Sequence, residues 1–253
     1  MASWTTHERH YRYYDNCFLK RTLSPSEYQR DFRGQLHISL DNAARLANEA
    51  ATLDFIGQET DIPVPRVIHA GEHSDGSYHL WTELVPGVPL KEFPLSDQHT
   101  VIEQIERYKR TLQGLRSSCI GGPTGIVCPP PVAKQLQRDE MWITKHSPAK
   151  GYVFCHNDLS QSNVIVDPDT LEVNGIIDWE FAGFFPKCFD VPFYRSPKPS
   201  GAQIRSLADT CELEQFFSVW ELDQTFSFLD LQYLTSECTR DWVEEGPYSC
   251  PSL

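Results

Sequence analysis

Hydrophobic and polar residues alternate along the first part of the chain in the manner of short β-strands. The segments HYRYYD (10–15) and CFLKRTL (17–23) alternate on either side of a short polar turn, which predicts a two-stranded hairpin. Residues 61–72 and 77–87 are also predicted to be strands. Their prolines favour the edge or the entry of a sheet over a central position, because proline cannot donate to the strand ladder.

A helical period separates these two pairs of strands. Between residues 43 and 56, apolar side chains recur at spacings of three and four and so share one face of a helix, with Ser39 or Asp41 as the candidate N-cap. The face consists of Ala43, Leu46, Ala47, Ala50, Leu53 and Ile56. Residues 1–85 are therefore expected to form a small sheet with one helix.

The remainder, residues 86–253, is expected to form a second and mainly helical lobe. A connection with three prolines (86–98) leads into a helical pattern over 100–118, and helical patterning returns at 212–245. The glycine- and proline-rich segment 119–131 is interpreted as a structural loop, because it lacks the strand-before and helix-after context of a phosphate-binding loop.

Charge and composition exclude several classes of protein. The 253 residues include 35 acidic and 22 basic side chains, for a net charge of −13, and such a surface repels nucleic acid and anionic lipid. The N-terminal segment has no apolar run of signal-peptide length, so a cytoplasmic protein without membrane or nucleic-acid partners is expected. His69 and His73 are four residues apart, but the intervening Gly71 and a strand-like context argue against a helical metal site.

The loop in FCHNDLSQSNVIV (154–166) carries the strongest chemical signal. It places His156, Asp158 and Asn163 between two apolar runs, and the five-residue interval from Asp158 to Asn163 is that of the kinase catalytic loop. Asp178 follows at the end of another apolar strand, where an anion needs a cation or several hydrogen bonds. Asp158 and Asn163 could also be ordinary turn formers, but the joint pattern favours a site for metal and phosphate.

These motifs resemble the aminoglycoside phosphotransferase and choline kinase family, which has a protein-kinase-like fold. The segment HNDLSQSNVIVDPDTLEVNGIIDWEFAGFFP is similar to its HGDLxxxN and IxDWE signatures, and WTELVPGVPL resembles its hinge between lobes. The resemblance implies a bilobal α+β protein, with a small antiparallel sheet plus helix before a larger, mainly helical lobe. It also implies an ATP- and Mg²⁺-dependent phosphotransferase that acts on a hydroxyl of a small molecule.

The resemblance also implies roles in the second lobe. Asp158 would be the catalytic base or orient the acceptor hydroxyl, and His156 would brace the catalytic loop. Asn163 and Asp178 would bind magnesium, and Glu180 would match the second acid of the family's motif, as a metal ligand or a neighbour of one.

In the first lobe, the resemblance assigns residues to the nucleotide. Lys20 would contact the phosphates and pair with Glu49 on the predicted helix. Main-chain groups of Glu83 and Val85 would bind adenine, with Thr82 beside the pocket.

The chain departs from the family pattern before this lysine. Only nineteen residues precede Lys20 and none of them is glycine, so the phosphate-covering loop is expected to be missing or replaced. Arg21 would point to the opposite strand face, which favours Lys20, although a lysine at a sheet edge could simply be solvated.

The acceptor and a rival function are the remaining expectations. The acidic balance would suit a cationic acceptor, for which tryptophans could supply a cation-binding face or could simply be core residues. These tryptophans are Trp142, Trp179, Trp220 and Trp242. The alternative to an enzyme is a catalytically retired binding or scaffold module, and a metal-dependent hydrolase is a third and less favoured reading. The sequence gives no oligomeric state.

Overall fold

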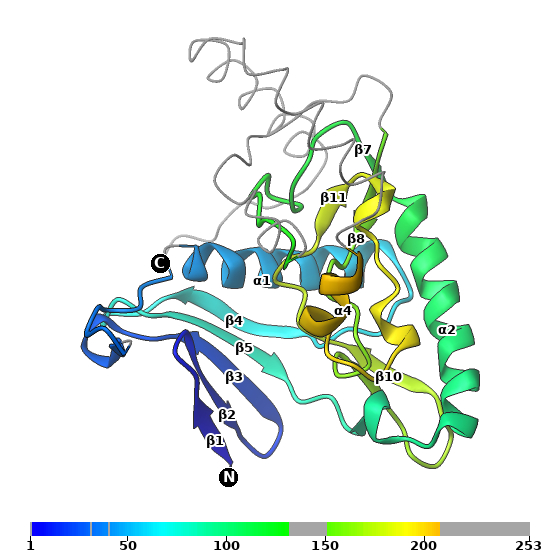
Figure 1. Ribbon diagram of the computed structural model, residues 1–253, viewed down its shortest axis with the longest axis horizontal. Helices are drawn as coiled ribbons and strands as arrows, with labels where there is room; N and C mark the ends of the chain where they lie inside the picture. Colours follow the sequence, from blue (N-terminus) through cyan, green and yellow to red (C-terminus); the bar gives the residue numbers. More distant parts are fainter. Residues whose placement is uncertain (1, 31, 40, 132–150, 208–253) are drawn as a thin grey trace.

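A five-stranded antiparallel sheet forms the N-terminal lobe of the computed structural model, which describes residues 2–30, 32–39, 41–131 and 151–207. Its strand order is β1-β2-β3-β5-β4 (Figure 1). The strands are β1 (Ser3–Thr5), β2 (Arg9–Tyr13), β3 (Cys17–Thr22), β4 (Val67–Glu72) and β5 (Tyr78–Glu83). The predicted hairpin and the two later strands are confirmed, and β4, which follows the prolines, lies at the sheet edge. The sequence did not reveal β1.

The register of the sheet decides which side chains face the second lobe. Tyr11 of β2 lies opposite Lys20 of β3, and Phe18, two residues before Lys20, shares its face because side chains alternate along a strand. Arg21 points to the other face, where its guanidinium binds the Glu27 carboxylate at 2.7 Å.

Helix α1 (Asn42–Glu59) lies along β4 and β5 (Figure 1). Asp41 occupies the N-cap position, but its side chain makes no capping hydrogen bond. The predicted apolar stripe is correct in the middle of the helix, where Leu46, Leu53 and Ile56 are buried, and wrong at Ala43, which is exposed. Polar residues of α1 are buried as well, because this helix is covered by the sheet on one side and by the second lobe on the other.

The C-terminal lobe combines helices with two small sheets of three strands each, in the orders β10-β9-β6 and β11-β8-β7. Its helices are α2 (Leu95–Gly114) and α4 (Ser200–Leu207). Its strands are β6 (Val88–Pro89), β7 (Arg116–Ser117), β8 (Tyr152–Cys155), β9 (Val164–Val166), β10 (Val173–Ile176) and β11 (Gly183–Phe185). Short 3₁₀ turns of this lobe lie at Leu90–Glu92, Lys187–Phe189 and Phe193–Arg195, and another lies at Pro25–Glu27 in the N-terminal lobe. The predicted helix at 212–245 lies outside the described residues.

One hydrophobic core joins the lobes. The second half of α1 contributes Leu53 and Ile56 to the same cluster as Phe154 of β8 and Ile105 of α2. The ring of Phe55 lies 5.4 Å from that of Phe154, which fixes α1 against β8, the strand that leads into the loop 156–163. No helix in the described part of the chain is both long and apolar enough to cross a membrane.

The glycine- and proline-rich segment after α2 packs as a structural loop. Gly121 pairs with Phe184 of β11, and Gly122 approaches the Asn48 amide of α1 so closely that an added Cβ would lie 1.8 Å from its oxygen. The loop thus fastens α1 to the C-terminal lobe.

Gly87, in the connection between the lobes, has a backbone that only glycine adopts without strain. Its φ is +127°, and an added Cβ would lie 2.5 Å from the carbonyl oxygen of Val166 in β9. Gly87→Ala should therefore lower the free energy of unfolding by about 2–4 kcal/mol, from backbone strain and overpacking together. Chemical denaturation measures this. The matched control is Gly114→Ala at the end of α2, where nothing lies near the added Cβ and little change is expected. Equal stabilities of the two variants would contradict the role of Gly87.

Candidate active site

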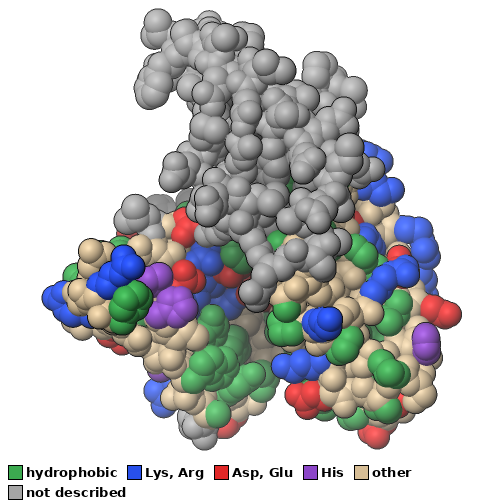
Figure 2. All heavy atoms as spheres, in the orientation of Figure 1, with side chains coloured by type: hydrophobic (Ala, Val, Ile, Leu, Met, Phe, Trp, Pro, Cys, Tyr) green, Lys and Arg blue, Asp and Glu red, His purple; other side chains and the backbone are tan. Residues whose placement is uncertain are grey.

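A cavity of about 550 Å³ lies between the N-terminal sheet and the C-terminal lobe. The surface is hollowed there, and hydrophobic side chains gather on the N-terminal side (Figure 2). Trp4, Tyr11, Tyr13 and Phe18 form an aromatic roof, in which the rings of Trp4 and Tyr11 stack at 4.8 Å. The connection 82–87 lines another part of the wall. Such a flat, apolar pocket suits a planar ring.

Lys20 joins three elements at one end of this cavity. Its ammonium group donates to the carboxylate of Glu49 on α1 at 2.7 Å and to that of Asp178 at 2.5 Å. Lys20 is only 7% exposed, and burial acts to lower its pKa. The charges of Asp178 and Glu49 outweigh burial and raise the pKa of Lys20 above its ordinary value, so the ammonium keeps its charge.

Asp178 and Asn163 line the same cavity. Although burial acts to raise the pKa of Asp178, the Lys20 ammonium lowers it below its ordinary value, so Asp178 is an anion at neutral pH. Its backbone has a φ of +67°, which is rare for residues other than glycine and is found in sites held in place by their surroundings. The amide nitrogen of Asn163 donates to the Asp158 carbonyl at 2.8 Å, which fixes its side chain on the loop.

His156 braces the loop from behind and does not line the cavity. It is fully buried, and burial lowers its pKa to about 4, so the imidazole is neutral. The main-chain N–H of Asp158 donates to its Nδ1 at 3.3 Å, which leaves Nε2–H to donate to the Ile177 carbonyl at 3.1 Å. His156 therefore ties the catalytic loop to the residue before Asp178. Trp179 is buried against this ring as a core residue. The other candidates for a cation-binding face, Trp142, Trp220 and Trp242, lie outside the described residues.

Asp158 does not line the cavity itself, but its main-chain carbonyl accepts a hydrogen bond from Asn163, which does. Burial and the charges of Asp178 and Glu180 raise its pKa to about 7, against a weaker opposing effect of the Ser200 hydroxyl at the start of α4. Its Oδ1 is buried without a hydrogen-bond partner. A carboxylate in this environment is well placed to accept a proton near neutral pH. Asn157, where glycine is commoner in the family, adopts a φ of +65°.

Glu180 lies behind the cavity, between two arginines. Arg9 of β2 forms a close ion pair with one of its oxygens, and Arg45 of α1 lies 3.6 Å from the other. Oxygens of Glu180, Glu49 and Asp178 lie within 4.8 Å of one another, so three carboxylates share this region. The sequence reasoning missed Arg9 and Arg45, because no motif marks them. The available signal was an arginine in line with the aromatic residues of β2, at position 9, and an arginine among the small residues of α1, at position 45.

The residues predicted to bind the nucleotide base lie together at the connection between the lobes. Thr82, Glu83 and Val85 all line the cavity. The N–H of Glu83 already donates to the Arg66 carbonyl at 2.9 Å, so the carbonyl of Glu83 is the main-chain group of this residue to consider for a ligand.

Two strands do precede the lysine strand, with a short connection that contains no glycine. Residues Thr6–Glu8 join β1 to β2, and Glu8 binds Arg45 at 2.8 Å. The Asn42 side chain donates to the Glu8 carbonyl at 2.7 Å and accepts from Arg9 at 2.7 Å. The expected replacement of the glycine loop is thus a connection fastened to the first turn of α1.

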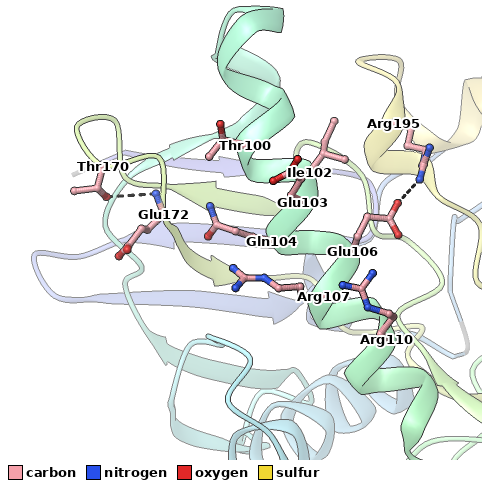
Figure 3. Close-up of a pocket in the computed structure, with 10 residues that line it drawn as sticks. All are labelled: Thr100, Ile102, Glu103, Gln104, Glu106, Arg107, Arg110, Thr170, Glu172 and Arg195. Carbon is pink, nitrogen blue, oxygen red and sulfur yellow. Dashed lines mark hydrogen bonds and ion pairs between the residues drawn. The ribbon is translucent and has the colours of Figure 1, made fainter.

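A second hollow, of about 790 Å³, lies between α2 and the β9–β10 turn (Figure 3). Arginines and glutamates from α2 project into it, and Arg195 pairs with Glu106. The hollow is larger than the cleft cavity, but its lining contains none of the predicted site residues, so we place the candidate site in the cleft.

Because Asp158 is largely buried, we expect its ionised carboxylate to lower the free energy of unfolding. The pKa of Asp158 is about 7 in the folded chain and near 4 in the unfolded chain. Between about pH 4 and pH 7 the folded chain therefore keeps a proton on Asp158 that the unfolded chain has released, and the free energy of unfolding falls as the pH rises. Asp158→Asn should therefore be more stable than the parent at pH 8, by at most about 4 kcal/mol, with the gain vanishing near pH 4. Urea denaturation across this range measures it. Asp169→Asn in the exposed turn is the control, and a pH-independent difference for Asp158→Asn would contradict the assignment.

Comparison with known proteins finds similarity to phosphotransferases, both in a family model and in curated relatives. Residues 128–194 match the phosphotransferase enzyme family. The chain is 29% identical over 160 residues to an aminoglycoside 3'-phosphotransferase of Streptomyces fradiae and 31% identical over 164 residues to that of Streptomyces ribosidificus. Each match covers 54% of this chain, and the chain spans only 59% and 60% of these relatives. Ethanolamine kinase 2 of Rattus norvegicus is 38% identical over 66 residues, covering 24% of this chain and 16% of that protein.

Solved structures share the fold. An aminoglycoside phosphotransferase from Streptomyces rimosus superposes with a TM-score of 0.52 at 20% identity, covering 83% of this chain and 86% of that one. The GDP complex of aminoglycoside 2'-phosphotransferase-IIIa gives 0.53 at 12% identity, over 94% and 91%. The predicted bilobal, protein-kinase-like fold and the resemblance to the aminoglycoside phosphotransferase and choline kinase family are thereby confirmed.

Proposed function

We propose that this protein transfers the γ-phosphoryl group of ATP to a hydroxyl of a small molecule. The observation that carries the proposal is the contact of Lys20 with both Glu49 and Asp178, beside a cavity that Asn163 also lines. A buried cation held between two carboxylates, next to a carboxylate with a near-neutral pKa, is the arrangement that phosphoryl transfer requires.

The nucleotide base would lie under the aromatic roof. Stacking on Phe18 and Tyr11 would supply apolar contact, and the carbonyl of Glu83 and the main chain of Val85 would supply hydrogen bonds, with Thr82 beside them. The ammonium of Lys20 would then neutralise charge on the phosphates. A neighbour of the same fold has been solved with GDP, which supports nucleotide binding in this cleft.

The donor set of the site fits magnesium. Asn163 and Asp178 offer an amide oxygen and a carboxylate, and hard oxygen ligands are those that Mg²⁺ prefers. These two residues would hold the ion, which supplies neutralisation of phosphate charge when bound. Glu180 has both oxygens directed at arginines, so we assign it the support of Asp178 from behind.

Asp158 would act on the acceptor. Its carboxylate would orient the acceptor hydroxyl and take its proton, while the hydroxyl oxygen bonds to the γ-phosphorus and the bond from that phosphorus to ADP breaks. His156 would contribute by holding the main chain of Asp158, since it donates to and accepts from backbone groups only. The transfer needs the two oxygens in line, which the fixed loop favours.

The acceptor proposed is a hydroxylated amine. The curated relatives are named as aminoglycoside phosphotransferases and an ethanolamine kinase, and both names describe acceptors that carry amines beside hydroxyls. The net charge of −13 suits a cationic acceptor.

A retired binding module is the second candidate. The connection Thr6–Glu8 has no glycine and is held to α1 through Arg45, so it offers the phosphates less main-chain freedom than a glycine loop would. Such a module would bind nucleotide without turnover. The two candidates therefore differ in product formation and not in binding.

Asp158→Asn separates these candidates by activity. With γ-labelled ATP, magnesium and a panel of aminoglycosides and amino alcohols, the parent should yield a phosphorylated product detectable by mass, and the variant should lose about 100-fold or more in rate. Nucleotide binding should be retained. Asp169→Asn in the exposed turn should keep full activity. A variant as fast as the parent would exclude Asp158 as the base, and nucleotide binding without product from any acceptor would favour the retired module.

Lys20→Met tests the phosphate contact. Magnesium and ATP should raise the melting temperature of the parent, because a ligand that binds only the folded state stabilises it, and this ligand-induced rise should largely disappear in the variant. Arg21→Met is the matched control, since Arg21 is the next residue and faces away. Equal ligand-induced shifts in both variants would contradict the role of Lys20, whatever their stabilities without ligand.

A further inference from the structure

The turn between β4 and β5 gathers two histidines and an aspartate that phosphoryl transfer does not use. A nitrogen of His73, a nitrogen of His79 and a carboxylate oxygen of Asp75 all lie within 4.8 Å of one another. The sequence argued against a helical metal site at His69 and His73. The hairpin instead brings His73 next to His79, six residues later on the opposite strand.

The backbone of the hairpin fixes this arrangement. The N–H of His73 donates to the Ser77 carbonyl at 2.7 Å, and the N–H of Gly76 donates to the His73 carbonyl at 2.9 Å, which closes a tight turn. The rings of His73 and His79 consequently lie parallel, with centroids 4.6 Å apart and 5° between their planes. Both ligands therefore come from one rigid supersecondary unit.

Asp75 is held beside the ring of His73 by Ser77. One carboxylate oxygen accepts from the N–H and the hydroxyl of Ser77, at 3.0 Å and 2.6 Å, and lies 3.4 Å from Nδ1 of His73. The hydroxyl of the buried Ser77 also lies 2.9 Å from Nε2 of His79. The hydrogen bonds from Ser77 lower the pKa of Asp75 to about 2, so this carboxylate is ionised at neutral pH.

The chemistry of these three groups is that of a transition-metal site. Two imidazole nitrogens and one carboxylate oxygen form a known zinc donor set, with water as the fourth ligand. Tetrahedral bonds of about 2.0–2.2 Å need donor atoms about 3.3 Å apart. Because a metal ion lies in the plane of each imidazole that binds it, the exposed ring of His73 must turn out of its stack on His79, and the exposed Asp75 carboxylate must rotate toward both, to bind one ion.

We propose that His73, Asp75 and His79 bind one divalent transition-metal ion of the zinc class. The ion fastens the turn to β5, the strand that ends at the connection between the lobes. This site is separate from the cleft and does not rest on the proposed phosphotransferase activity.

The test uses the full chain after removal of metal by a chelator. Calorimetric titration with Zn²⁺ alone should show one saturable site involving this turn, and Co²⁺ should give the absorption of a tetrahedral complex. His79→Ala and Asp75→Asn should each weaken this binding by at least about tenfold, equivalent to about 1.4 kcal/mol. His99→Ala, an exposed histidine on α2, is the matched control and should bind as the parent does. Circular dichroism confirms that the variants are folded.

Three outcomes would overturn the proposal. These are the absence of saturable Zn²⁺ or Co²⁺ binding, unchanged binding in folded His79→Ala and Asp75→Asn, and loss of binding in His37→Ala instead. The last would transfer the ion to His7, Glu8 and His37, whose ligand atoms also lie close together. Because no nucleotide is present, none of these results depends on the phosphotransferase activity.

Discussion

The contact of Lys20 with Glu49 and Asp178 is the interaction on which the rest of the site depends. It joins β3, α1 and the segment after β10, three elements that are far apart in the sequence. Because all three groups are at least partly removed from water, each charge relies on the others for compensation, and breaking such a buried pair is costly. The positions of the sheet, the helix and the segment that carries Asp178 are therefore set together.

A second layer of charge supports this contact. Glu180, Glu49 and Asp178 bring three carboxyl groups within 4.8 Å of one another, and Arg9 and Arg45 add positive charge behind them. The arginines also hold the β1–β2 connection, through Glu8 and Asn42. The β1–β2 connection is thus linked, through these arginines, to the segment that carries Asp178 and Glu180.

The loop 156–163, which we propose to be catalytic, combines residues that stabilise the fold with one that costs stability. His156 is neutral and satisfied by main-chain partners, so it stabilises the loop. Asp158 has a buried, unpaired oxygen and a raised pKa, which cost stability in the absence of substrate. Active sites commonly carry such unfavourable groups, because a carboxylate that is fully satisfied by the protein has little left to offer a substrate.

The sequence by itself determined the features that depend on neighbours along the chain. The β2–β3 hairpin follows from alternation, and the loop set of His156, Asp158 and Asn163 lies within eight residues, so local spacing was sufficient. The pairing of Lys20 with Glu49 came only through a family resemblance. The ion pairs of Arg9 and Arg45 with Glu180 were decided by tertiary structure, because Arg9 and Glu180 are 171 positions apart in the sequence. The buried polar face of α1 was also decided there, because the spacing of residues along a helix does not show which face a second lobe will cover. The same holds for His73 and His79, which only the hairpin register brings together.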